Sequence, residues 1–376
     1  MRCFSLLLAA FALLTAPAAA QEAEAKPAWV GVWQGTIGKL PVIACLDKRY
    51  NSGGIGSYYY RKHLKPIGLW LYDDSPDWVE HPPGENKTAR WTFNSVGADT
   101  ITGTWSDGKR RLPIRLTALA WQDAETAYIP CEALAFISPR LAGGEVIQEA
   151  AETDGIAYVS HRYRNPPQLD VSANGFSLIV DQPGDAAINA AVANYIPTGT
   201  LADDWVECLS GAMSHLGGDG YFDRDVRPEM ISDAFIAISI AGSTYCGGAH
   251  PNHVGFHRLF DRQSGEEIEL DEWFADAAFQ TDEYDTRPMT EGFREHVLAF
   301  ADSEGSEADY DAECLALART QGYWNLQLTR DGVTFTPDLP HVATACENPI
   351  SVPWSALDDW LSDAGRAGKA RLLASD

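Results

Sequence analysis

Long apolar segments are missing from this chain of 376 residues. The longest apolar run, Phe4–Leu14, is well short of the roughly 20 residues that a helix needs to cross a bilayer. Arg2 precedes this run and the small residues Ala18–Ala20 follow it, which is the pattern of a secretory signal peptide. We therefore expect residues 1–20 to be removed on export. The mature chain is expected to be soluble, periplasmic or secreted, without membrane insertion.

Basic residues are scarce, and the deficit lies in the second part of the chain. The sequence holds 28 Lys and Arg against 53 Asp and Glu, a formal net charge of −25. From Ala150 onward 13 basic residues face 38 acidic ones, whereas Gln21–Glu149 has 14 against 15. This balance disfavours a nucleic-acid partner, because phosphate binding needs a basic surface. It favours a cationic protein, peptide or ion, unless the charge only keeps an exported protein in solution.

Common catalytic signatures are also missing. The sequence contains no Gly-x-Ser-x-Gly motif, no phosphate-cradling glycine loop and no Cys-x-x-Cys pair. Carboxylates are abundant, but their number in an acidic chain is no evidence for a glycosidase, which needs two particular groups across a cleft. We therefore interpret the chain as a non-catalytic binding protein without a cofactor.

Seven cysteines are present, and Cys3 leaves with the predicted signal peptide. The remaining six are an even set in a chain sent to an oxidising compartment, where disulfides persist. We predict three disulfides: Cys45 with Cys131, Cys208 with Cys246, and Cys314 with Cys346. Two of these cysteines lie in the first part of the chain and four in the second, which argues against a bridge between the parts.

Secondary-structure signals change near Ser138–Glu145. Before this break, short aromatic and β-branched runs alternate with turn residues, and the clearest hairpin turn is Asp107-Gly108. These signals predict a β-rich accessory domain over residues 28–140, a small antiparallel barrel or sandwich of seven or eight strands. After the break, strands and helices mix irregularly. This predicts an acidic α+β domain over residues 150–376, with an antiparallel sheet and helices on one face.

Aromatic residues are dense in the first part. They could form a sugar-stacking surface, but aromatic residues that alternate along strands more often form a core, which is the interpretation we favour. The set comprises Trp29, Trp33, Trp70, Trp78, Trp91, Trp105 and Trp121 with Tyr58, Tyr59 and Tyr60.

Four segments of the second part share an order and spacing with a known family. They are residues 231–239, Tyr245-Cys-Gly-Gly-Ala-His-Pro-Asn252, Phe260-Asp-Arg-Gln-Ser-Gly265 and Ile268-Glu-Leu-Asp-Glu-Trp-Phe274. Over roughly residues 155–362 the chain resembles the extracellular domain of RsiV-type anti-sigma factors. In the best-understood members this domain binds lysozyme. The resemblance implies a binding role at the cell envelope, with a basic, lysozyme-like protein or a peptidoglycan fragment as partner. The transmembrane helix and sigma-binding segment of those proteins are missing, so signalling is not implied.

The turn after the predicted strand 234–241 is where we expect the functional surface. Its consecutive glycines, Gly247 and Gly248, allow a tight backbone path, and His250 and Asn252 follow them. We assign these four residues to ligand binding. The alternative is a cell-wall-directed hydrolase with His250 in the active site.

Two clusters contain metal-ligand side chains, but neither has the required spacing. On an extended strand His253 and His257 lie about 13 Å apart, too far for one ion, unless His250 folds back toward one of them. The stretch 217–225 holds three aspartates but lacks the central glycine and closing glutamate of a calcium loop. We predict an ordinary acidic loop there and no metal site.

Two acidic runs, 266–285 and 302–313, contain Trp273 and Tyr310, respectively. Carboxylates around aromatic side chains can steer a basic protein inward, so we add Trp273 and Tyr310 to the predicted ligand-binding residues. The alternative is that these runs are solvated helix faces over an ordinary core. Asp271 is expected to be the N-cap of a short helix within the first run.

Overall fold

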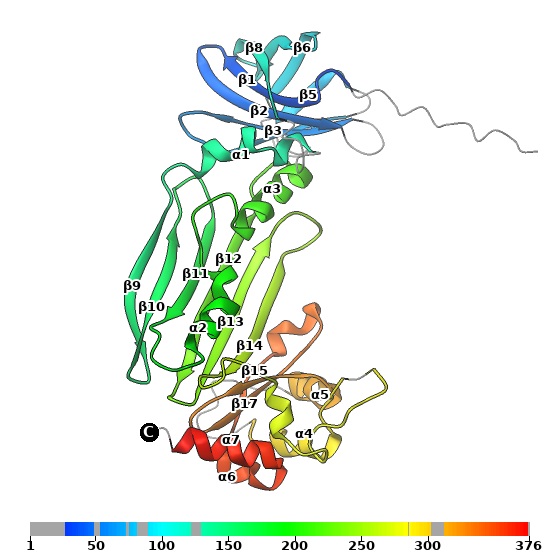
Figure 1. The fold of residues 1–376 in the computed structure, drawn as a ribbon. Coiled ribbons are helices and arrows are strands. Elements are labelled where there is room, and N and C mark those ends of the chain that lie inside the picture. The colour runs from blue at the N-terminus through cyan, green and yellow to red at the C-terminus, as the bar shows by residue number, and fades with distance from the viewer. Residues whose placement is uncertain are drawn as a thin grey trace, which may run out of the picture.

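The computed structural model describes residues 27–48, 53–72, 75–80, 89–121, 129–284, 286–301 and 312–374. In Figure 1 the chain forms three successive parts: a barrel, a larger sheet, and a smaller sheet with helices around it. The predicted signal peptide, Tyr310 and most of the acidic run 302–313 lie outside the described residues.

The first part is a closed antiparallel barrel. Each strand pairs with its sequence neighbour, and β1 also pairs with β8 to close the circle. The strands are β1 (Gly31–Ile37), β2 (Leu40–Lys48), β3 (Gly54–Tyr60), β4 (Ile67–Leu71), β5 (Asp77–Glu80), β6 (Arg90–Val96), β7 (Thr100–Ser106) and β8 (Arg111–Leu119). The structure therefore selects the barrel among the predicted architectures, and the turn at Asp107-Gly108 joins β7 to β8 as expected.

Most aromatic side chains of the barrel form its core, as predicted. Those at most 8% exposed are Trp33, Trp78, Trp91, Trp105, Tyr58 and Tyr59. One carboxylate, Glu80, lies among them and is 8% exposed. Its Oε1 accepts hydrogen bonds from the Tyr58 hydroxyl (2.6 Å), Trp105 Nε1 (2.6 Å) and Trp91 Nε1 (3.3 Å). Burial, and then the charge of Glu80, raise the pKa of Tyr58, so its phenol remains a donor.

The second part is a seven-stranded sheet with the order β15-β14-β13-β12-β11-β10-β9. The strands are β9 (Glu145–Thr153), β10 (Ile156–Arg164), β11 (Val171–Leu178), β12 (Tyr221–Ile231), β13 (Phe235–Tyr245), β14 (Asn252–Asp261) and β15 (Glu267–Ile268). The α+β class is confirmed, with one correction: β11 and β12 are parallel, while the other neighbours are antiparallel. The long connection between them contains helices, which lets the chain return in the same direction.

That connection carries α2 (Asp185–Val192), a 3₁₀ turn η3 (Ala193–Tyr195) and α3 (Asp204–Leu216). Both α-helices lie in front of the sheet in Figure 1, where α2 contacts β11 and α3 contacts β12 and β13. Helix α3 begins at Asp204, and its buried residues include Trp205, Leu209 and Met213.

The barrel and the seven-stranded sheet share a hydrophobic cluster. Its members come from β1–β3, from the segment after β8, from α3 and from β10–β12, and include Val32, Tyr59, Phe136, Trp205 and Phe222. That segment contains η1 (Pro130–Glu132), α1 (Leu134–Ile137) and η2 (Ser138–Leu141). The buried Arg140 side chain donates to the Leu64 carbonyl (3.0 Å) and to both oxygens of Asp219 (2.5 and 2.7 Å). An ion pair and an apolar cluster thus fix the barrel against the sheet.

Three disulfides are formed: Cys45–Cys131, Cys208–Cys246 and Cys314–Cys346. This is the pairing that the sequence analysis predicts. The first ties β2 to η1, and the second ties α3 to the end of β13. The third ties α5 to the 3₁₀ turn η5 (His341–Cys346). Disulfides of this kind are typical of proteins outside the reducing cytosol.

The third part, called the C-terminal unit, is a three-stranded sheet with helices. Its elements are β16 (Trp324–Leu328), β17 (Gly332–Pro337), β18 (Ile350–Pro353), η4 (Leu270–Trp273), α4 (Glu291–Leu298), α5 (Ala312–Thr320), η5, α6 (Trp354–Leu357), η6 (Asp358–Trp360) and α7 (Asp363–Leu373). Trp273 is 5% exposed in its core and contacts the Phe235 ring edge-on at 5.4 Å. None of the helices in the described residues combines the length and apolar character needed to cross a bilayer.

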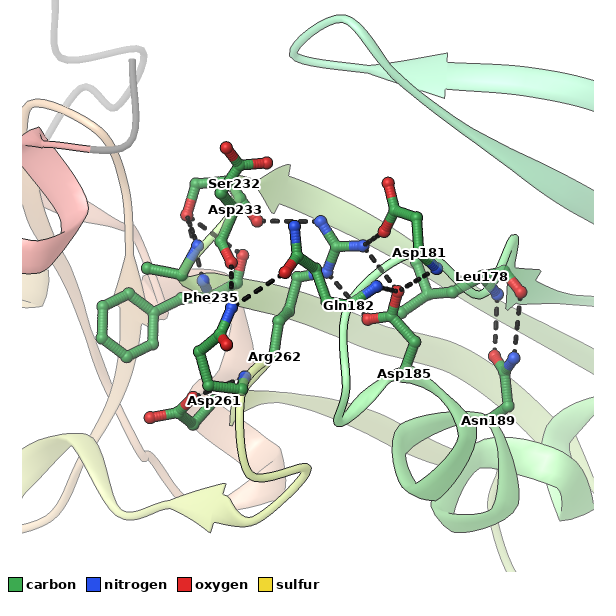
Figure 2. Close-up of polar contacts among 12 residues, drawn as sticks. Leu178, Asp181, Gln182, Asp185, Asn189, Ser232, Asp233, Phe235, Asp261 and Arg262 are labelled. Atoms are coloured by element: carbon green, nitrogen blue, oxygen red, sulfur yellow. Dashed lines mark hydrogen bonds and ion pairs between the residues drawn. The ribbon is translucent and has the colours of Figure 1, made fainter.

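Figure 2 shows a buried arginine that fastens the sheet to α2. Arg262, fully buried just after β14, donates to Asp185 (2.9 and 2.8 Å) and Asp181 (2.6 Å) on one side. On its other side it donates to the Ser232 carbonyl (3.0 Å) in the turn between β12 and β13. These hydrogen bonds give Arg262 a structural role.

Two local predictions are wrong. The predicted N-cap Asp271 lies inside η4, which Glu269 precedes without a side-chain cap. The predicted acidic loop 217–225 is largely strand, because Asp223 and Asp225 belong to β12, while Asp219 pairs with Arg140. Their carboxylates therefore do not converge as calcium ligands.

Candidate functional site

The glycine turn between β13 and β14 is held against helix α3. Gly247 and Gly248 have φ angles of 97° and 110°, which an L side chain rarely adopts, so glycine suits both positions. Cys246 is bonded to Cys208 of α3, and a side chain on Gly247 would meet His215 of the same helix at 3.0 Å. The turn is therefore a fixed feature of the surface.

Three histidine rings stack beside this turn. The His341 ring of η5 stacks with those of His250 and His253, at centroid distances of 4.7 and 5.6 Å and with planes within 20°. His250 Nδ1 lies 2.9 Å from the Pro251 carbonyl. Stacked planes turn the ring faces, not the nitrogen lone pairs, toward one another, so the stack does not converge on a metal ion. Among the described residues no group of three His, Cys, Asp or Glu could hold one.

A cleft opens further along β14, where the seven-stranded sheet meets the C-terminal unit. It has a volume of about 270 Å³ and is lined by β14, β15, η4, β16 and the residues around Phe279 and Arg287. Its charged and polar lining is His257, Arg258, Glu267, Glu269, Asp271, Arg287, Tyr323, Asn325 and Asp338. We call this the acidic cleft, because its carboxylates outnumber its guanidinium groups.

The two arginines of the acidic cleft are already paired. Arg258 binds Glu267 through two hydrogen bonds of 2.7 Å, and Arg287 lies 3.4 Å from Asp271. Within the described part of the chain, Glu269 and Asp338 have no ion-pair partner. Burial, and then the charges of Asp271, Glu267 and Glu272, raise the pKa of Glu269. The cleft is thus a site of uncompensated negative charge.

His257 is an uncharged side chain in the lining of the acidic cleft. It lies on β14, lines the cleft, and has a buried Nδ1 without a hydrogen-bond partner among the described residues. Burial lowers the pKa of this imidazole, although Glu229 opposes the effect. At neutral pH His257 therefore adds no positive charge to offset the carboxylates.

The predicted site residues are only partly brought together. Asn252 is the first residue of β14, and Gly247, Gly248 and His250 lie in the turn before it, with His250 in the histidine stack. Trp273 is in the core of the C-terminal unit, so its ring is not available on the surface as predicted. The acidic run from Glu266 supplies three lining carboxylates of the cleft.

Sequence reasoning missed His341, Asp338 and the role of Glu269. His341 and Asp338 lie about 90 residues beyond the glycine turn, and the packing of the C-terminal unit against β14 brings His341 to the histidine stack and Asp338 to the acidic cleft. Glu267, Glu269 and Asp271 occupy every second position of the acidic run, and all three line the cleft.

Comparisons with known proteins give a partial likeness. No protein-family model and no curated protein matches the chain. A crystal structure of a DUF3298 family member from Bacteroides fragilis has 14% identity, covers 60% of this chain and 96% of its own, with a TM-score of 0.38. A DUF3298 family protein from Pseudomonas aeruginosa PAO1 has 16% identity, covers 58% and 94%, with a TM-score of 0.36. At this level the likeness says nothing about what the chain binds.

Proposed function

We propose that this chain is an exported, non-catalytic binding protein whose acidic cleft receives a basic side chain of a protein partner, such as lysozyme, or of a cell-wall ligand. The observation that carries the proposal is that Glu269 and Asp338 face a cleft whose arginines are already paired. A lysine or arginine of the partner would supply the missing counter-charge and form charge-assisted hydrogen bonds.

The glycine turn and the histidine stack form the neighbouring part of the proposed surface. Both border β14, the strand that also lines the acidic cleft. We propose residues 150–376 as the binding domain and the barrel, residues 28–140, as an accessory domain.

A cell-wall hydrolase with His250 in its active site is the alternative. General acid–base catalysis needs a partner that orients or exchanges a proton with the imidazole. The described contacts of His250 are the His341 ring and the Pro251 carbonyl, which supply neither a nucleophile nor a carboxylate. The geometry therefore favours binding.

Titration calorimetry with lysozyme, repeated at increasing salt, tests the proposal. Glu269→Gln with Asp338→Asn is expected to weaken binding at least tenfold, since charge-assisted bonds are lost. Glu149→Gln with Glu152→Gln removes two exposed carboxylates of edge strand β9 and should leave affinity within twofold. If the two double substitutions weakened binding equally, the attraction would come from the overall charge of the chain and not from the cleft. Release of peptidoglycan fragments that His250→Ala abolishes would instead establish the hydrolase.

A further inference from the structure

Basic side chains gather at one end of the barrel. Adjacent strands run in opposite directions, so the turns β1–β2, β3–β4 and β7–β8 lie at the same end. Seven exposed basic residues occupy these turns or the first position of β8, and one of them, Lys65, lines a pocket together with Asp170 and Asp219. We call the other six the basic rim: Lys39, Arg61, Lys62, Lys109, Arg110 and Arg111.

The basic rim is continuous across four neighbouring strands. The Gly38 amide donates to the Pro113 carbonyl (2.8 Å), which holds the β1–β2 turn against the start of β8. The Arg61 amide donates to the Pro41 carbonyl (3.0 Å), which holds the end of β3 against the start of β2. Neighbouring strands are about 4.8 Å apart. Lys39, Arg61 and Arg111 therefore follow one another around the barrel mouth.

Positive charge in the rim is largely uncompensated. In the described turns at this end the one carboxylate is Asp107, which pairs with Arg110 at 2.7 Å. Arg61 donates to the neutral Gln34 side chain (3.1 Å). Within the described residues, Lys39, Lys62, Lys109 and Arg111 have no ion-pair partner. A chain of net charge −25 thus concentrates cations on one face.

Leu40 lies within the rim and gives it an apolar contact. It follows Lys39 directly and is 55% exposed, one of the few large apolar side chains of the barrel that face solvent. Exposed apolar side chains next to basic residues are typical of segments that lie on lipid bilayers, with charges at the headgroups and the apolar group at the acyl boundary.

We propose that the basic rim binds the anionic surface of a lipid bilayer. The six cations lie against phosphate headgroups and Leu40 dips below them, so that the barrel is a peripheral membrane contact and no segment is inserted across the bilayer. Each Lys or Arg near an anionic surface raises affinity about fivefold. Repulsion from the acidic remainder of the chain is screened beyond roughly 8 Å at physiological salt.

Co-sedimentation of the purified protein with vesicles tests this proposal. The probe is a vesicle of equal parts phosphatidylglycerol and phosphatidylcholine, and the reference is pure phosphatidylcholine. Lys109→Ala with Arg111→Ala should weaken binding to the anionic vesicle about 25-fold, from two such contributions. Both side chains are exposed, and within the described residues neither makes a hydrogen bond or an ion pair, so the fold should be retained. The matched control is Arg115→Ala with Arg162→Ala, two exposed arginines outside the rim, and should change binding less than twofold.

A second variant separates a membrane from a soluble polyanion. Leu40→Ser keeps every charge, so it should weaken vesicle binding several-fold and leave binding of inorganic polyphosphate unchanged. Equal binding to both vesicles, or equal loss in the rim and control pairs, would overturn the proposal. So would Leu40→Ser having no effect on vesicles, because the rim would then be a site for soluble polyanions.

Discussion

Arg262 allows the sharpest test of how the sheet is held together. Its guanidinium is fully buried, and so is the carboxylate of its partner Asp185. Replacing Arg262 with Met keeps the volume but leaves a buried carboxylate without its counter-charge. Breaking a buried pair in this way costs about 3–5 kcal/mol. The Ser232 carbonyl also loses its donor, which makes the upper end of that range our expectation.

Equilibrium urea unfolding measures this cost, with two comparisons. Asp181, the second partner, is 57% exposed, so Asp181→Ala should cost no more than about 1 kcal/mol. Arg371→Met is the matched control, because that arginine pairs with Asp261 at 2.7 Å on the surface and is 44% exposed. Its loss should also cost about 1 kcal/mol or less. If Arg262→Met were no more costly than Arg371→Met, the argument from burial would be refuted.

Three further predictions concern other parts of the fold. Replacing Cys45 and Cys131 with Ala should lower the free energy of unfolding by about 2–5 kcal/mol, measured by calorimetry, and an unchanged melting temperature would contradict a stabilising role. Burial lowers the pKa of His257 in the folded chain, so the free energy of unfolding should fall as the pH drops below 6.5, where the unfolded chain binds the proton. In urea titrations, His257→Gln should make the free energy of unfolding depend less steeply on pH in this range. Glu80→Ala leaves three buried donors without an acceptor, at a cost of about 1–3 kcal/mol each. An unfolding midpoint equal to that of Glu80→Gln would contradict this expectation.

Period-two patterns made the barrel predictable, whereas β12 and β9 carry weaker patterns of this kind. Strand β12 alternates between buried and exposed residues, but Arg224 takes one buried position and Pro228 another. Arg224 is tolerated there because its guanidinium pairs with Asp204 and lies over the Phe222 ring. Strand β9 has few buried residues, since it is an edge strand, and so gives little apolar signal.

The candidate site was predictable only where its residues are local in sequence. The glycine turn carries its own signal, and the acidic run from Glu266 supplies the cleft. Trp273 could not be distinguished from a surface aromatic, because its burial depends on α7, about 90 residues later. The stack on His341 likewise depends on how the C-terminal unit packs, which no local pattern encodes.

The close packing of α7 on Trp273 determines how the C-terminal end of the chain is held. A methyl group on Gly365 would lie 2.0 Å from the Trp273 carbonyl oxygen, and one on Gly368 would lie 2.4 Å from its indole. Helix α7 can therefore pack against Trp273 only when positions 365 and 368 have no side chain. Displacement of α7 would expose the buried Trp273 indole to water, so the fluorescence of Trp273 should report whether the C-terminal helix is docked.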